Sequence, residues 1–167
     1  FHMGRSLVKL GRTDDARRHC EQSLAIDPRN TVALYTRAGL DANAGRIEDA
    51  IAGYRTLLSL DPTNNENALA LGRLLLRLER TEEAEGVFHR ILEQDPTIRM
   101  ATLGLSAVEL RRGRPAEAAT LLATVLAEEP GNVPCLEQLT IVLHGLGRDE
   151  ETAGHFARAL AAAEPPD

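Results

Sequence analysis

A proline that recurs every 34 residues is the feature that most constrains this chain. Pro28, Pro62, Pro96 and Pro130 are 34 positions apart each time, and an acidic residue precedes each one. Because proline lacks a backbone N–H and clashes with the preceding helical turn, each one ends a helix. A helix stop at a fixed interval indicates a chain built from copies of one unit, stacked in a row.

Alignment of the repeats on their prolines gives four columns of residues that share a physical character. Glycines that end a first helix stand 17 positions before the proline, and small residues that allow close helix contacts stand 12 and 24 positions before it. A large residue 8 positions before it can fill the gap between repeats. The columns are Gly11, Gly45, Glu79, Gly113 and Gly147; Ala16, Ala50, Ala84, Ala118 and Thr152; Gly4, Ala38, Gly72, Ser106 and Thr140; and Cys20, Tyr54, Phe88, Leu122 and Phe156.

Within a repeat the apolar residues follow a helical period. Leu71, Leu74, Leu75 and Leu78 are spaced i, i+3, i+4 and i+7, which predicts one buried helix face. The second half of each repeat begins with acidic residues, such as Glu82 beside Glu83, that complement the positive end of a helix dipole. Each repeat is therefore predicted to contain two helices separated by the glycine turn.

A 34-residue helix–turn–helix unit with small residues at the helix contacts, a large residue in the second helix and a terminal proline resembles the tetratricopeptide repeat (TPR). The resemblance implies an all-α, right-handed α-solenoid, or superhelix, formed by the whole chain as a single array. A pentatricopeptide array, which binds RNA, has a longer period and fits less well. The predicted repeats are residues 1–30 (partial), 31–64, 65–98, 99–132 and 133–166.

The departures from the family pattern are local. Arg37, Asp41 and Glu109 stand where the pattern prefers large apolar residues, and Glu79 replaces a turn glycine. They predict a looser second repeat without changing the fold.

Composition excludes some partners and leaves others open. A net charge of −6 argues against nucleic acid, and no apolar run is long enough for membrane insertion. Lys9 is the only lysine beside eighteen arginines, a bias typical of GC-rich bacterial genes. Cys20 and Cys135 lie too far apart in a stacked array to form a disulfide, which favours the cytoplasm over the periplasm. The chain begins at Phe1, as expected of a piece of a longer protein, so the compartment stays open.

The sequence contains no recognisable catalytic motif. It has no histidine pair at helical spacing beside a glutamate, no glycine-rich phosphate loop and no cysteine pair at metal spacing. We therefore expect a non-catalytic scaffold without a metal or another cofactor. Two alternatives stay open: the array is the targeting arm of a larger enzyme, as in TPR-bearing glycosyltransferases and sulfotransferases, or it forms a homodimer through an uncovered end that carries Phe156, Ala159 and Leu160.

In the TPR family the concave surface made by the first helices usually holds the ligand. Carried onto this sequence, the resemblance places apolar residues and arginines on that surface, which favours a protein or peptide partner with acidic and apolar residues. The lysine and asparagine clamp that binds chaperone tails is missing. Packing between first helices is the alternative explanation for Leu76. The expected partner-binding residues are Tyr35, Asn43, Leu69, Arg73, Leu76, Arg77, Met100, Leu103 and Arg111.

An arginine also stands in every repeat at the same place after the first helix. Two interpretations are open: the cations neutralise the exposed carbonyls at the helix end, or they form a basic ladder that binds a partner. We favour the first. The column is Arg12, Arg46, Arg80, Arg114 and Arg148.

Overall fold

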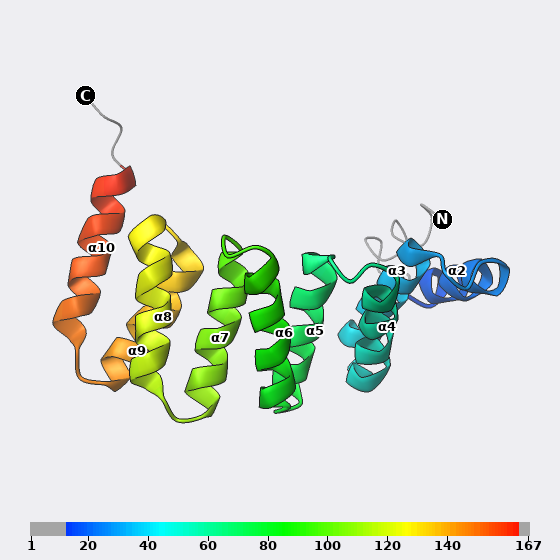
Figure 1. Cartoon of the computed structure of the whole chain (residues 1–167), viewed down its shortest axis with the longest axis horizontal. Helices are drawn as coiled ribbons and strands as arrows, with labels where there is room; N and C mark the ends of the chain where they lie inside the picture. The colour runs from blue at the N-terminus through cyan, green and yellow to red at the C-terminus, as the bar shows by residue number, and fades with distance from the viewer. Residues whose placement is uncertain (1–12, 164–167) are drawn as a thin grey trace. The chain divides into compact units, whose positions relative to one another are not determined.

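The computed structural model describes residues 13–163, and every regular element in this range is an α-helix. Successive helices are joined by short turns (Figure 1). The predicted all-α repeat solenoid is confirmed, while the first helix of the partial first repeat lies outside the described residues. The helices are α2 (Thr13–Ile26), α3 (Thr31–Asn43), α4 (Ile47–Leu60), α5 (Asn65–Arg77), α6 (Thr81–Gln94), α7 (Arg99–Arg111), α8 (Pro115–Glu128), α9 (Val133–Gly145) and α10 (Asp149–Ala163).

The chain forms two compact parts, an N-terminal part that ends at Val87 and a C-terminal part that begins at Phe88. In the N-terminal part, α3 packs between α2 and α4, and α4 also packs on α5. In the C-terminal part, α8 packs between α7 and α9, and α9 also packs on α10. The boundary falls inside α6, and we describe each part by itself.

The turn between the two helices of a repeat has one conformation throughout the described residues. Gly45, Gly113 and Gly147 have φ values of 77°, 72° and 70°, the left-handed region that glycine adopts without strain. The next residue donates its backbone N–H to the carbonyl five positions earlier, as from Arg114 to Glu109 at 2.9 Å. This pattern closes the helix end in a Schellman motif. Glu79 adopts the same geometry with a φ of 58°.

Aspartate and asparagine side chains hold the proline turns between repeats in place, and the proline spacing alone did not predict these contacts. The Asp61 carboxylate accepts the backbone N–H of Thr63 at 3.1 Å, and Asp27 and Asp95 make the same contact in their turns. The Asn64 side chain then caps α5 by accepting the backbone N–H of Asn67 at 3.0 Å. Asn30 and Asn132 cap α3 and α9 in the same way.

Most members of the small and large columns lie in the core. Ala16, Ala50, Ala84 and Ala118 are each 0% exposed. Phe88 is also fully buried, and its ring lies against Gly104 of α7, where an added Cβ would be only 2.4 Å from the ring. The glycine therefore makes the space that this aromatic side chain fills.

Candidate partner-binding faces

The predicted site residues of the N-terminal part are only partly accessible. Arg73 and Arg77 on α5 are exposed, and Tyr35 and Leu69, which hold equivalent places on α3 and α5, are half-buried. Leu76, by contrast, is 6% exposed and belongs to the core. Packing between helices accounts for Leu76, so it is not part of an accessible binding face.

Tyr35 joins a polar and aromatic cluster formed by α3, α4 and α5. Its hydroxyl donates to Glu66 Oε1 at 2.7 Å, and its ring meets Tyr54 edge to face with the centroids 5.9 Å apart. Burial raises the pKa of the Tyr54 hydroxyl, the Arg73 charge lowers it and the Glu66 charge raises it. The Arg73 charge therefore acts on the same cluster. The positions of these residues in the repeat did not predict that they interact.

Asn43 lies elsewhere in the N-terminal part. Its side chain is exposed at the end of α3 and borders a pocket of about 510 Å³ together with Arg17 and Arg46. Tyr35 and Arg73 thus belong to one cluster, whereas Asn43 lies beside a separate pocket.

We call Tyr35, Glu66, Leu69, Arg73 and Arg77 the N-terminal face.

In the C-terminal part the predicted residues again divide into exposed and buried. Met100 on α7 is 45% exposed and Arg111 is exposed, whereas Leu103 is 6% exposed and packs in the core with Leu122 and Leu139. Leu103 therefore stabilises the stack and is not an accessible anchor. Three further apolar residues, which the expected set left out, are exposed on first helices: Leu110 at 38%, Val133 at 58% and Ile141 at 73%. We call Met100, Leu110, Arg111 and Ile141 the C-terminal face.

The arginine column is held by carboxylates. Arg46 Nε lies 2.8 Å from Asp41 and Arg114 Nε lies 2.7 Å from Glu109, both at the end of the preceding first helix. In the other two described repeats this place holds a leucine, and the arginine turns forward to the second helix. There Arg80 reaches Glu83 and Arg148 reaches Glu151, each at 2.6 Å.

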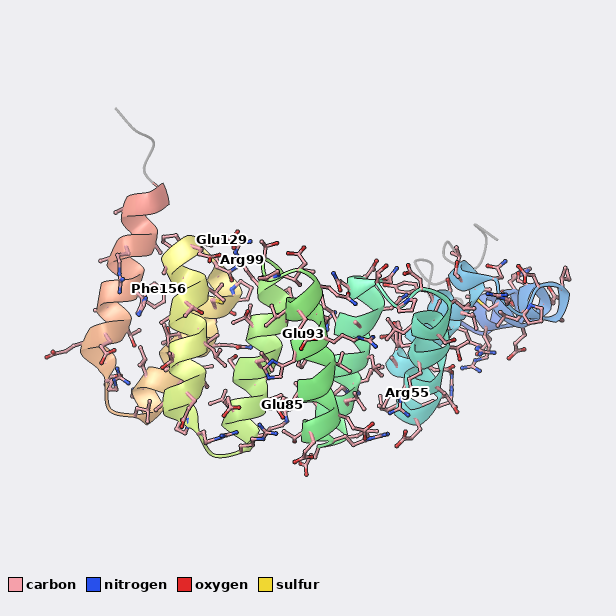
Figure 2. All side chains as sticks on the ribbon, viewed as in Figure 1. Arg55, Glu85, Glu93, Arg99, Glu129 and Phe156 are labelled. Atoms are coloured by element: carbon pink, nitrogen blue, oxygen red, sulfur yellow. The ribbon has the colours of Figure 1, made fainter. Side chains whose placement is uncertain are left out.

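Neither interpretation of the column included this pairing with acids. The carbonyls at the helix end accept backbone N–H groups, and in the described repeats the guanidinium charges are compensated by acids. Arg99, outside the column, is also paired: it lies 3.2 Å from Glu129, and the two side chains approach each other in Figure 2. Arg12 lies outside the described residues.

The arginines of the two faces differ from these. Within residues 13–163, Arg73 and Arg77 form no ion pair, and Arg111 donates only to the main-chain carbonyl of Ala107 at 3.4 Å. A guanidinium with free donors can bind a carboxylate in a two-pronged, charge-assisted contact. Both faces therefore present uncompensated positive charge beside apolar side chains, although the whole chain is acidic.

Other kinds of site find little support among the described residues. No group of three or more histidine, cysteine, aspartate or glutamate side chains there is arranged to hold a metal ion. No described helix is both long and apolar enough to cross a membrane. Cys20 and Cys135 are buried free thiols, and burial raises the pKa of Cys135 to about 11. That thiol is protonated at neutral pH and is a poor nucleophile.

Two family models described as tetratricopeptide repeat match this sequence, one over residues 7–58 and the other over residues 69–133. The chain belongs to the tetratricopeptide repeat family. The TPR resemblance is thus confirmed. Among curated protein sequences, none matches this TPR chain.

Solved structures similar to this TPR chain show the same fold. The crystal structure of MamA has a TM-score of 0.79 and 22% identity over 95% of this chain and 92% of its own. A TPR protein from Parabacteroides merdae has a TM-score of 0.84 and 24% identity over 98% of this chain and 64% of its own. YrrB, described as a TPR protein with an unusual peptide-binding site, has a TM-score of 0.72 and 17% identity over 97% of this chain and 84% of its own.

Proposed function

We propose that this TPR chain is a non-catalytic scaffold that binds a protein or peptide segment on the exposed sides of its first helices. The partner segment combines acidic and apolar residues. The N-terminal face offers Leu69, Arg73 and Arg77, and the C-terminal face offers Met100 and Arg111. Each face is proposed as a binding surface in its own right.

The observation that carries this proposal is the contrast between two sets of arginines. Those that follow the glycine turns are engaged by acids of the same chain, whereas Arg73, Arg77 and Arg111 are not, within the described residues. Long-range attraction of an acidic segment depends on local charge, because a surface with uncompensated cations concentrates the field there. The neighbouring apolar side chains provide area that a partner can remove from water.

Two further facts favour a peptide ligand. A helix face with anchors at i, i+4 and i+8, here Leu69, Arg73 and Arg77, suits an extended or helical segment that lies along it. YrrB, a protein of the same fold, is described as having a peptide-binding site. We infer the same class of ligand for this chain, and not the same ligand.

Self-association is the second candidate function. Phe156 on α10 is 48% exposed, although the equivalent residues of the described repeats are buried. Burial of this ring against a second copy would provide apolar contact area. Light scattering of wild type and Phe156→Ala over a range of protein concentrations separates the monomer from the dimer.

The test of the peptide-binding proposal is charge reversal on each face. Proteins retained by the intact chain in an affinity pull-down are identified, and the binding segment is measured by fluorescence anisotropy. We expect Arg73→Glu with Arg77→Glu, or Arg111→Glu alone, to weaken binding at least about tenfold, the size of one lost charge-assisted contact. Circular dichroism is expected to show unchanged helicity, because all three side chains are exposed.

The matched controls are exposed arginines on second helices: Arg90→Glu with Arg158→Glu makes the same change in net charge as the double variant, and Arg90→Glu alone makes the same change as Arg111→Glu. Affinities within about a factor of two of wild type for the variants of both faces would contradict the proposal. If the control weakens binding as much as the face variants, the effect is one of net charge, and the faces are not the site.

A further inference from the structure

The second repeat replaces two core leucines with charged residues. Arg37 stands where the next three repeats have Leu71, Leu105 and Leu139, which are 4%, 6% and 2% exposed. Asp41, one turn further along α3, stands where the third repeat has Leu75 and is itself only 4% exposed. Charges at buried positions lower stability unless they are compensated, so their presence calls for a reason.

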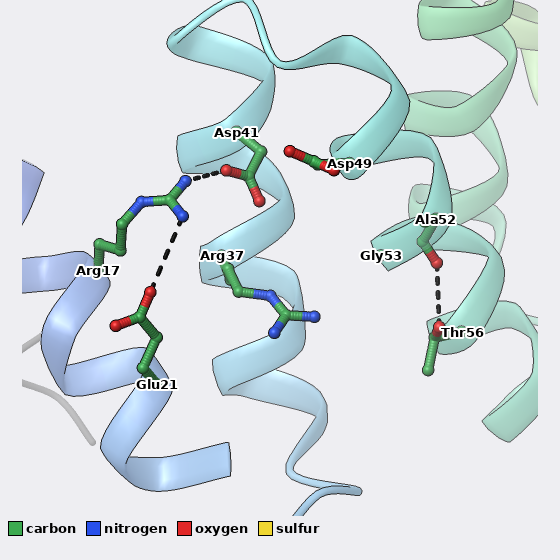
Figure 3. Close-up of a pocket in the computed structure, with 8 residues that line it drawn as sticks. All are labelled: Arg17, Glu21, Arg37, Asp41, Asp49, Ala52, Gly53 and Thr56. Carbon is green, nitrogen blue, oxygen red and sulfur yellow. Dashed lines mark hydrogen bonds and ion pairs between the residues drawn. The ribbon is translucent and has the colours of Figure 1, made fainter. Parts of the chain in front are cut away.

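Both substitutions open onto one pocket. It has a volume of about 330 Å³ and lies between α2, α3 and α4 of the N-terminal part (Figure 3). Gly53 of α4 also lines it, and this glycine allows α4 to approach α3 closely, since an added Cβ would lie 2.9 Å from the Cβ of Ala38. The two charged departures from the repeat pattern thus converge on a single cavity, which is large enough for a small ligand.

The charges around this pocket are unequally satisfied. Asp41 is bound by Arg17 of α2 and by Arg46 at 2.8 Å, and Arg17 also lies 3.9 Å from Glu21. Arg37 is half-buried and Asp49 lies at the start of α4, and neither forms an ion pair within the described residues. In Figure 3 the Arg37 side chain extends from α3 toward α4, away from the Arg17–Asp41 contact.

We propose that this pocket binds a small dipolar group with one carboxylate and one ammonium, of the size of a single amino acid. Arg37 binds the carboxylate with two parallel N–H donors, and Asp49 accepts hydrogen bonds from the ammonium. Such a ligand compensates both charges at once, whereas a simple anion leaves Asp49 unpaired and a simple cation leaves Arg37 unpaired. The pocket uses no residue of the N-terminal or C-terminal face, so this proposal stands independently of the proposed function.

The test is a titration of the whole ¹⁵N-labelled chain, followed by NMR chemical shifts. Three probes with three carbons each are compared: L-alanine carries both charges, propionate carries the carboxylate only and propylamine carries the ammonium only. A dipeptide of lysine and glutamate, acetylated and amidated at its ends, supplies the same charges from side chains. We expect L-alanine, the dipeptide or both to shift signals of α3 and α4 around Arg37 and Asp49, and to bind more tightly than either single-charge probe.

Arg37→Leu restores the residue that the following repeats carry at this place, so the variant is expected to fold. Because it lacks the guanidinium, we expect it to lose at least about tenfold in affinity for the dipolar probe. Asp49→Asn, an exposed substitution, is expected to reduce the preference for the dipolar probe over propionate. Arg18→Leu on α2, outside the pocket, is the control and should leave both unchanged.

The probes distinguish two possible sources of the ligand. Binding of L-alanine supports a free amino acid as the ligand, and binding of the dipeptide alone supports a pair of side chains from a partner protein. The proposal is overturned if no probe shifts these signals, if propionate or propylamine binds as tightly as the dipolar probes, or if Arg37→Leu keeps its affinity within about a factor of two.

Discussion

Phe88 and Phe156 occupy the same place in α6 and α10, yet their surroundings differ completely. Phe88 is fully buried, and its ring fills the space beside Gly104 of α7. Phe156 is 48% exposed, and no described helix follows α10. The residue and its position in the repeat are identical, so the difference comes only from the neighbour.

The two helices also start alike. Each follows an arginine that pairs with a glutamate in the first turn, Arg80 with Glu83 before α6 and Arg148 with Glu151 before α10. Local structure is therefore the same in both, and the tertiary contact is what distinguishes them. In a helical repeat the stability of each helix pair depends chiefly on the pair stacked next to it.

Phe88→Ala is expected to have the largest effect in this comparison. Removal of a fully buried aromatic ring leaves a cavity, and we expect a loss of about 3–5 kcal/mol in the free energy of unfolding. Phe156→Ala, the matched substitution on an exposed side chain, is expected to cost less than about 1 kcal/mol. Urea unfolding followed by circular dichroism measures both.

A cost below about 1 kcal/mol for Phe88→Ala would mean that the column alignment does not identify the contacts between repeats. Equal costs for the two variants would show that Phe156 is covered in solution, for instance by a second copy. The first result would contradict the comparison between the two phenylalanines, and the second would show that a further contact covers Phe156.

The sequence predicted the positions that a fixed backbone geometry demands. Gly113 and Gly147 ended their helices in the left-handed conformation, and Ala84 was buried, because glycine adopts that conformation without strain and a small residue allows close helix contact. The binding face was harder to predict. Leu69 and Leu103 hold equivalent places, yet one is half-buried and the other belongs to the core, because the side chains on the neighbouring helix decide how much of the surface is covered.

The partners of the ion pairs could not be predicted from the sequence either. Arg46 has acids on both sides along the chain, Asp41 before it and Asp49 after it, and spacing alone does not choose between them. The structure shows Arg46 paired with Asp41, where a buried carboxylate needs a cation, and Arg80 paired with Glu83, where a leucine takes the buried place. The partner follows from which side chain fills the core.

The turns that precede the two helices provide a second, smaller test. Glu79 adopts a φ of 58° before α6, whereas Gly147 provides the same turn before α10 at 70°. A side chain in this region costs about 1–2 kcal/mol relative to glycine. We expect Glu79→Gly to stabilise the chain by about 1 kcal/mol and Gly147→Ala to destabilise it by a similar amount, both measured by urea unfolding. If Glu79→Gly is destabilising, a contact of the Glu79 side chain outweighs the strain.

The smallest expected effect is the pH dependence that α6 and α10 share. The hydrogen bonds from Arg80 and Arg148 hold the pKa values of Glu83 and Glu151 below their ordinary value of 4.5. A carboxylate with a lowered pKa in the folded state stabilises the fold above its unfolded pKa, and this contribution is lost as the pH falls through the folded value. Both ion pairs are exposed, so each contribution is screened by water and salt.

We therefore expect the urea midpoint of the wild-type chain to fall below about pH 4.5, and to fall less in Glu83→Gln and in Glu151→Gln. Glu82→Gln, next to Glu83 but in no ion pair within the described residues, is the control. Similar reductions for Glu83→Gln and Glu151→Gln would show that helix-start chemistry is independent of the stacking that separates Phe88 from Phe156. A reduction confined to Glu83→Gln would instead mean that the start of α10 is not ordered in solution, since an ion pair stabilises a helix only where the helix is formed.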